Sequence, residues 1–550
     1  MKEISRILFV FLSATVLSSC IASVDNGSKP CVAIPVPNVD ALVFTTQPVS
    51  MTIATYNNGV TLSCKAQPTD NDKTVEITYQ WYQSEDGTIE TGILQEGSNS
   101  STFTTDVFTE KGIRYYYCAA TAKMQSEYGI SNSTVFSDVV TVAYTGLPLI
   151  KIETEDGANP SEAKEKHNGR IYLICNGQTV YDSGEDNELS IKVRGNATAY
   201  YPKKSYKLKL PKKANLLDSV NPLKSSENKD KNWVLLAGYC DKTLLRTMAG
   251  FYTASIFNEL DGNEQLYVPQ AEFVDVMLNG EYIGNYTLTD SVKEGSGRVP
   301  VNEKSEGAGG IGFIAEYDFL YYENEPKWFK SSQKQYPYTF KFPDTDDANF
   351  DSHMADFETY INRFESALYD SETTDDWKNY IDIESFARWF LVNNVLANIE
   401  PNFYFHKESS EDSSKLVMGP FWDFEWSIGI GWYAGTRPRS PEYWSLKERN
   451  IEWYFADLIK KNEFKTELKT QWTKLKGKYP DLAKTINDRM DEWAGEIDIS
   501  QQMNFKKWDI LNQRVSVGGI PLGSYGAELE CDKQFITERV RWLDDEITGL

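Results

Sequence analysis

Short apolar runs alternate with polar turn residues over the N-terminal part of the chain. Residues 43–146 contain the runs VTLSCKAQ, ITYQWYQ, IRYYYCAATA and VVTVAYT, which are rich in β-branched and aromatic residues. Runs of this length and composition, bounded by turn signals, predict β-strands. We therefore expect an all-β module over residues 43–146.

The pattern changes along residues 149–550. The first half, residues 149–345, keeps a two-residue period in IYLICNG, LSIKVRG, SYKLKL and EFVDVMLNGEYIGNYTLTD, where Asn279-Gly280 predicts a hairpin turn. The second half, residues 350–550, has helical spacing in DFETYINRFESALYD and ESFARWFLVNNVLANI. Strands followed by helices predict an α+β domain.

The first residues have the form of an export signal. Lys2 and Arg6 precede an apolar run that ends at Leu17, and small residues lead to Cys20. The run is too short to span a bilayer, and small residues before a Cys resemble the bacterial lipobox. We expect a lipoprotein signal peptide over 1–19, lipidation of Cys20 and a tether over 20–42. The alternative is an ordinary signal peptide with a chance Cys.

Cys64 and Cys118 flank Trp81 within the β-rich module, and Tyr116 lies two residues before the second Cys. This order resembles immunoglobulin-like sandwiches. The resemblance implies a Cys64–Cys118 disulfide, with Trp81 packed against it. It also implies a hydrogen bond from the Tyr116 hydroxyl that stabilises a corner between strands. Export would permit the disulfide. Pairing of the other cysteines stays open among Cys31, Cys175, Cys240 and Cys531.

The amino-acid composition excludes several classes of protein. The 550 residues are 41% hydrophobic and carry a net charge of −24, which argues against nucleic-acid binding, a disordered chain and a small disulfide scaffold. Only three histidines occur, so a three-His metal site would need all of them.

One basic segment stands out in this acidic chain. Residues 191–213 hold eight basic residues and no acid: Lys192, Arg194, Lys203, Lys204, Lys207, Lys209, Lys212 and Lys213. Alternation in SYKLKL places Lys207 and Lys209 on one strand face. Lysine and arginine side chains on such a face could bind a phosphate group. A solvated strand face or contact with anionic lipid is the alternative.

Acidic residues among apolar neighbours follow some 200 residues later. Glu400 and Asn402 lie in NIEPNF, and Asp423 and Glu425 lie in FWDFEW. Carboxylates and amides suit Mg²⁺, and Asp423 and Glu425 would share a face if their segment is extended. Buried acids also serve as caps or ion-pair partners. Gly307, Gly309 and Gly312 form G-x-G-x-x-G, but a strand-like run follows, so we expect a loop or hairpin rather than a dinucleotide site.

Six ordered blocks resemble the CotH kinase family, an atypical, shortened kinase-like fold. They are RGN with PKKSYKLKL, KNWVLLAGYCDKTLLRT, YVPQAEFVDVMLNGEYIGNYTLTD, GGIGFIAEYD, IESFARWFLVNNVLANIEPNFYFHK and KLVMGPFWDFEWSIG. The resemblance covers residues 149–550. It implies an α+β atypical kinase-like domain with a helical C-terminal half, and it implies ATP and Mg²⁺ as cofactors.

The resemblance also implies roles for individual residues. Glu400 and Asp423 would be catalytic, and Asp423, Glu425 and Asn402 would hold the metal. Nucleotide would contact residues of the basic segment and the third block: Arg194, Lys204, its rival Lys207, and Asp290. Arg246 matches a recurrent Arg of the family.

Two positions depart from the family pattern, because Glu400 and Glu425 stand where Asp is usual. An added methylene moves a carboxylate by roughly an ångström, and such a shift can cost about 10²-fold in rate. We expect a lipid-anchored kinase in the cell envelope, at the outer membrane or surface of a Gram-negative bacterium, that phosphorylates a protein hydroxyl. The alternatives are a degenerate surface lipoprotein that binds a glycan or partner protein, and an assembly factor of an envelope complex.

Overall fold

The structure is a computed structural model. It describes residues 42–69, 75–126, 129–162, 165–186, 188–220, 228–260, 266–295, 297–304, 310–370, 376–430, 440–446, 453–515 and 521–550. The expected signal peptide, the tether, Cys20, Cys31, Gly307 and Gly309 lie outside these residues.

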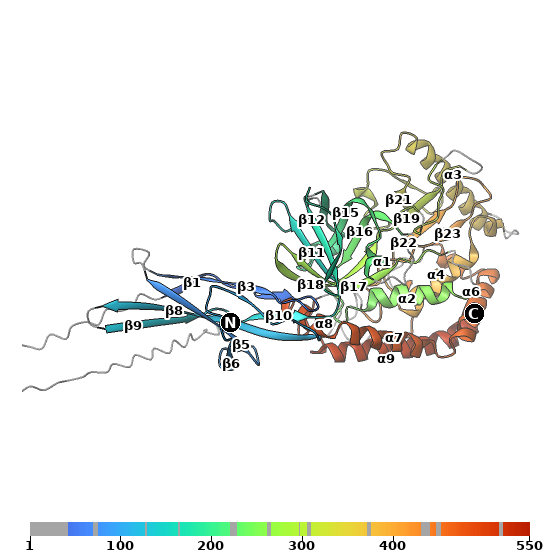
Figure 1. The fold of residues 1–550 in the computed structure, drawn as a ribbon. Coiled ribbons are helices and arrows are strands. Elements are labelled where there is room, and N and C mark those ends of the chain that lie inside the picture. The colour runs from blue at the N-terminus through green and yellow to red at the C-terminus, as the bar shows by residue number, and fades with distance from the viewer. Residues whose placement is uncertain are drawn as a thin grey trace, which may run out of the picture.

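The N-terminal region is built from strands, as the alternation predicts (Figure 1). One sheet has the order β2-β10-β8-β5-β6 with β9 beside β8, while β1 pairs with β4 and β3 with β7. The bounds are β1 Leu42–Thr46, β2 Met51–Ile53, β3 Thr61–Ser63, β4 Lys65–Pro68, β5 Glu76–Ser84, β6 Gly92–Leu94, β7 Thr102–Thr104, β8 Gly112–Ser126, β9 Gly129–Phe136 and β10 Val140–Tyr144.

Trp81 is fully buried in the core of this region, in one cluster with Cys64, Cys118 and Tyr116. Cys64 and Cys118 are thiols in the structure, where the disulfide was expected, and the interaction with Cys118 lowers the pKa of Cys64. The Tyr116 hydroxyl is buried and donates to no described residue, so the expected corner hydrogen bond is not made.

A closed barrel follows. Its strands run in the order β11-β17-β18-β16-β15-β14-β12-β13, and the pairing of β11 with β12 closes the ring and leaves β13 beside β12. The bounds are β11 Leu149–Thr154, β12 Lys166–Cys175, β13 Gln178–Asp182, β14 Leu189–Arg194, β15 Ser205–Ala214, β16 Asp230–Leu236, β17 Ala271–Leu278 and β18 Glu281–Asp290. The 3₁₀ turn η1 (Ala197–Tyr200) and helix α1 (Leu216–Val220) interrupt the strands.

Alternate residues of each strand fill the barrel. Ile191, Val193, Tyr206 and Leu208 point inward and are buried, so the residues between them point outward. The Asn279-Gly280 turn between β17 and β18 is confirmed, since Leu278 pairs with Glu281 and both turn residues have positive φ (50° and 82°).

The C-terminal half combines a smaller sheet with helices (Figure 1). The sheet order is β20-β21-β19-β22-β23, with bounds β19 Phe313–Tyr317, β20 Trp328–Lys330, β21 Pro337–Phe342, β22 Phe403–Lys407 and β23 Leu416–Met418. The helices are α2 Arg246–Asn258, α3 Phe350–Tyr369, α4 Ile383–Val395, α5 Phe455–Leu458, α6 Asn462–Lys478, α7 Leu482–Glu496, α8 Asp498–Lys507 and α9 Tyr525–Gly549, with 3₁₀ turns η2 Tyr322–Asn324 and η3 Asp376–Asn379.

Helix α4 is the centre of this half. It is capped by Asp382, which accepts from the Ser385 N–H at 2.7 Å, and every residue from Ser385 to Val395 is buried. A helix that is buried on all sides belongs to the core of the domain. Among the described helices, none combines the length and the apolar character that crossing a membrane requires.

The N-terminal region is docked onto the barrel through a shared apolar cluster. Met51 and Ala143 from the former pack with Met277 and Tyr282 from the barrel and Met503 from α8. The two parts therefore share a small core where they meet.

Candidate functional site

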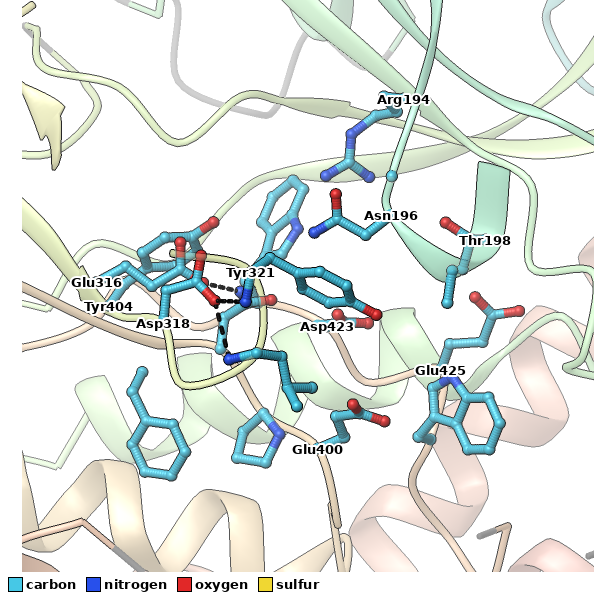
Figure 2. Close-up of a pocket in the computed structure, with 18 of the residues that line it drawn as sticks. Arg194, Asn196, Thr198, Glu316, Asp318, Tyr321, Glu400, Tyr404, Asp423 and Glu425 are labelled. Atoms are coloured by element: carbon cyan, nitrogen blue, oxygen red, sulfur yellow. Dashed lines mark hydrogen bonds between the residues drawn. The ribbon is translucent and has the colours of Figure 1, made fainter. Parts of the chain in front are cut away.

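A cavity of about 390 Å³ lies between the barrel and the smaller sheet (Figure 2). This volume is within the range of small-molecule sites. The charged and amide side chains that line it come from five segments of the chain: Arg194, Asn196, Glu316, Asp318, Glu325, Lys341, Glu400, Asn402, Asp423 and Glu425. The structure thus brings together Arg194 and the four predicted residues of the late segments.

The barrel contributes the end of the β14–β15 ladder. Arg194 is paired with Ser205 across the two strands, and both line the cavity. The Arg194 guanidinium lies over the Trp422 ring, 5.6 Å from its centroid, next to Asp423 in sequence. Burial in the cavity wall lowers the pKa of Arg194. This contact joins the early basic segment to the late acidic one.

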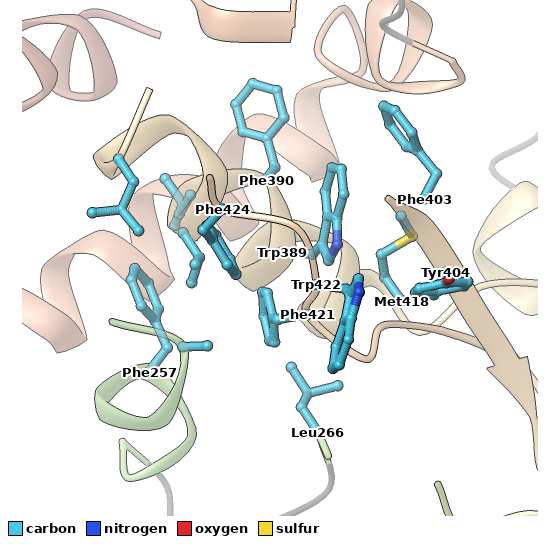
Figure 3. Packing of buried hydrophobic residues seen from close by; sticks show 14 of the residues in the cluster. Phe257, Leu266, Trp389, Phe390, Phe403, Tyr404, Met418, Phe421, Trp422 and Phe424 are labelled. Carbon is cyan, nitrogen blue, oxygen red and sulfur yellow. The ribbon is translucent and has the colours of Figure 1, made fainter. Parts of the chain in front are cut away.

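Asp423 and Glu425 lie on a loop, so the condition under which they would share a strand face is not met. Asp423 has a φ of 63°, which is in the left-handed region and not in the extended region of a regular strand. The intervening side chains explain the bend, because Phe421, Trp422 and Phe424 are all buried in the core around α4 (Figure 3). Apolar anchors on both sides of Asp423 thus force its carboxylate into the cavity.

Asn398 braces the two acidic segments. Its amide nitrogen donates to the main-chain carbonyl of Asp423 at 2.9 Å, and its Oδ1 accepts from the Glu400 N–H at 3.2 Å. A second link runs from the Ile428 N–H to the Leu396 carbonyl at 2.7 Å. Fully buried Asn398 was missed by the sequence reasoning, since NNVLANIE contains three Asn residues and nothing marks this one.

The acids share one electrostatic environment. Burial, followed by the charges of Glu425 and Glu400, raises the pKa of Asp423 to about 7. Burial also raises the pKa of Glu425, although the Cys240 N–H donates to its Oε1 at 2.9 Å and opposes this. Such mutual repulsion is relieved by a bound cation.

Glu316 and Lys341 form an ion pair across the cavity wall at 3.1 Å. Burial is the largest effect and opposes the charge on Lys341, but Glu316, Tyr404 and Glu325 together outweigh it and raise the pKa of the lysine. The amide of Asn402 also donates to Glu316 rather than facing Asp423. The sequence reasoning missed this lysine, because YTFKF shows only one Lys in a strand and its partner is set by the packing of β19 against β21.

The acidic residues of the cavity could hold Mg²⁺ only as a site that phosphate and water complete. Among the described residues, no His, Cys, Asp or Glu side chains gather in a group of three able to hold a metal. Mg²⁺ usually takes one or two protein carboxylates and completes its shell with phosphate and water. Asp423 meets this need, because its carboxylate has no hydrogen bond or ion pair to a described residue.

Three predicted nucleotide contacts do not line the cavity. Lys204 turns back to donate to the Ala199 carbonyl at 2.8 Å, and Lys207 points outward from β15 into solvent. Asp290 is fully buried at the end of β18, where it accepts from Asn228 at 2.7 Å and from Tyr267. Burial raises its pKa to about 6. Its role is therefore in the barrel and not at the cavity.

The buried lysine of the basic segment is Lys203. Its Nζ donates to the carbonyls of Ala237, at 2.6 Å, and Asn285, and burial lowers its pKa to about 7. Gly310 and Gly312, the described glycines of the Gly-rich run, do not line the cavity either. No signal in Pro-Lys-Lys distinguishes the buried lysine from its neighbour.

Arg246 lies behind the acidic loop. It forms ion pairs with Asp241 and Asp532, the latter at 2.6 Å, and its Nε donates to the Ser427 carbonyl at 3.1 Å. The recurrent Arg thus ties α2, α9 and the loop together without touching the cavity.

Comparison with known proteins gives one extended match. No curated protein matches the chain. Two solved structures, one described as the basis of Dscam isoform specificity and one of the four N-terminal Ig domains of Dscam1, align at 12% and 16% identity over 31% and 32% of the chain, each with a TM-score of 0.13. The chain spans 42% and 43% of their lengths, and such scores carry no argument. The family model for CotH kinase protein matches residues 191–543, well over half of the chain. The chain belongs to the CotH kinase family.

Proposed function

We propose that this protein is an atypical protein kinase that transfers phosphate from Mg²⁺-ATP to a protein hydroxyl. The observation that carries the proposal is that Arg194 from the barrel and Glu400, Asp423 and Glu425 from the late segments border one and the same cavity. Positive and negative groups on facing walls are what a nucleotide and its metal ion require. Membership of the CotH kinase family supports the same reaction.

Each residue has a proposed role. Asp423, assisted by Glu425, would hold Mg²⁺, while Arg194 and the Lys341–Glu316 pair would orient phosphate oxygens. When bound, Mg²⁺-ATP supplies the transferable phosphoryl group and neutralises the acids. Glu400 lines the same cavity and would accept the proton of the incoming hydroxyl.

Nucleotide binding is tested by thermal shift with Mg²⁺-ATP. Ligand at about 100 times its Kd stabilises a protein by about 2.7 kcal/mol, so the wild type should show a clear rise in Tm. Asp423→Asn keeps the shape of the side chain and should lose most of the shift. Asp186→Asn, on an exposed barrel loop, is the control. A wild type that does not respond to Mg²⁺-ATP contradicts the proposal.

Phosphate transfer is tested separately with radiolabelled ATP and a mixed protein substrate. Wild type should transfer label, and Glu400→Asp should change the rate by up to about 10²-fold because the carboxylate moves. Binding of Mg²⁺-ATP without transfer by either protein would leave a nucleotide-binding pseudokinase.

A degenerate surface lipoprotein that binds a glycan or partner protein is the second candidate. Two predicted metal ligands already have protein partners, since Glu425 accepts from Cys240 and Asn402 donates to Glu316. This candidate predicts no nucleotide response and retention on a polysaccharide or envelope-protein panel.

We further propose that the N-terminal region is an immunoglobulin-like module and that Cys20 carries a lipid in the cell envelope. Trp81 buried between strands, beside Cys64 and Cys118, supports the first part. Mass spectrometry of the N-terminal peptide tests the second, with Cys20→Ser as control. An unmodified Cys20 in membrane fractions would contradict lipidation.

A further inference from the structure

A row of exposed lysines crosses the outer face of the barrel. Lys166 on β12 is directly opposite Lys192 on β14, and Lys192 is directly opposite Lys207 on β15. Lys209 follows two residues further along β15 and is also exposed. We call these four residues the lysine ladder. Like charges directly opposite each other are destabilising, so the arrangement needs a reason.

The lysine ladder leads to the cavity. Lys192 and Arg194 share the outer face of β14, just as Lys207 and Ser205 share that of β15. The Arg194–Ser205 pair lines the cavity, the Lys192–Lys207 pair lies about 7 Å further out, and Lys209 lies about 7 Å beyond that. The positive charges therefore extend outward from the cavity in two-residue steps.

Among the described residues, no acid forms an ion pair with these lysines, although the chain as a whole carries −24. The pKa of Lys207 is lowered, first by partial burial of its stem and then by neighbouring cations only: Lys192, Arg194, Lys341 and Lys209. An unpaired cationic strip in an acidic protein selects for an anionic partner.

We propose that the lysine ladder is the docking track for an acidic segment of the protein substrate, whose hydroxyl enters the cavity. An extended peptide repeats every two residues, as the ladder does, so alternate Asp or Glu side chains would match its steps. The inference rests on the proposed kinase function for the role of the cavity. No exposed large apolar residue lies on β12, β14 or β15, which favours a peptide over insertion into a lipid surface.

The test measures docking without chemistry. A fluorescein-labelled peptide of alternating Glu and Ala around one Ser is titrated with the full chain, and anisotropy is followed at low and at physiological salt. We expect saturable binding that weakens with salt. The double variant Lys192→Glu, Lys207→Glu should weaken binding by roughly tenfold or more. Exchanging two facing lysines for two facing glutamates keeps the existing repulsion, so this variant should fold.

Matched controls separate the outcomes. Lys465→Glu, Lys469→Glu on α6 changes the net charge equally and should bind like wild type. Mg²⁺-ATP thermal shift should be the same in all three proteins. If the proteins show no Mg²⁺-ATP thermal shift but the wild type still binds the peptide, the kinase proposal is contradicted and the docking track is not. No peptide binding by wild type, equal loss in the α6 control, or binding to phosphatidylglycerol vesicles in place of the peptide would overturn the inference.

Discussion

The amide of Asn398 donates to the main-chain carbonyl of Asp423 at 2.9 Å, while its Oδ1 accepts from the Glu400 N–H. One buried side chain therefore sets the spacing between the proposed metal ligand and the proposed base. Neither acid could be placed by its own segment, because both segments are irregular at this point.

Replacing Asn398 should uncouple the two acids. Asn398→Ala leaves the Asp423 carbonyl and the Glu400 N–H without this partner, so we expect a smaller Mg²⁺-ATP thermal shift and a loss of about 1–3 kcal/mol of stability. Denaturant unfolding and thermal shift measure both effects. Asn487→Ala removes a similar bond to a carbonyl on α9 and should leave the nucleotide shift unchanged.

Gly250 on α2 should not tolerate a methyl group. A Cβ there would lie 2.2 Å from the ring of Phe424, which separates Asp423 from Glu425. Ala is favoured over Gly in helices by about 1 kcal/mol, yet we expect Gly250→Ala to lower both Tm and the nucleotide shift. Gly477→Ala on α6 meets nothing within 4 Å and should be neutral or stabilising. Equal behaviour of the two variants would show that the Phe424 contact is unimportant.

Arg246 should be critical for folding. Arg246→Met leaves Asp241 and Asp532 buried without their cation, which typically costs about 3–5 kcal/mol. Arg489→Met removes an exposed ion pair with Glu492 and should cost at most about 1 kcal/mol. Guanidinium unfolding curves compare the two variants.

The raised pKa of Asp423 gives two pH dependences. The pKa of an Asp is about 3.9 in an unfolded chain, whereas that of Asp423 in the folded protein is about 7. Between these pH values the folded protein binds more protons than the unfolded chain, so the contribution of Asp423 to the free energy of unfolding falls as pH rises. Metal binding needs the carboxylate, so Mg²⁺-ATP affinity should rise through about pH 7. Asp423→Asn should remove this contribution to the pH dependence of the free energy of unfolding. A wild-type affinity that is constant between pH 6 and 8 would contradict this assignment.

Cys64 and Cys118 should form a disulfide when the protein is oxidised. Both side chains are buried in one apolar cluster with Trp81. Peptide mass spectrometry with and without reductant should find the pair, and Cys64→Ala should lower stability by about 2–5 kcal/mol under oxidising conditions. Cys175, a half-buried thiol, should remain alkylatable and serves as the internal reference.

The β-rich start, the helical second half and the Asn279-Gly280 hairpin could be predicted from sequence because each depends on neighbours along the chain. Family resemblance pointed to Asp423, Glu425, Glu400 and Arg194, which all reach the cavity. The prediction that Lys204 contacts the nucleotide is wrong, because its Nζ instead donates to the nearby carbonyl of Ala199.

The sequence by itself determined the order of strands and helices and which segments carry charge, since side-chain period and composition are local properties. Only the tertiary structure decided which charges meet. The Glu316–Lys341 pair, the brace by Asn398 and the lysine ladder all depend on strand register and on loop packing. These contacts join residues from separate segments, and their distances are set by the buried core between them.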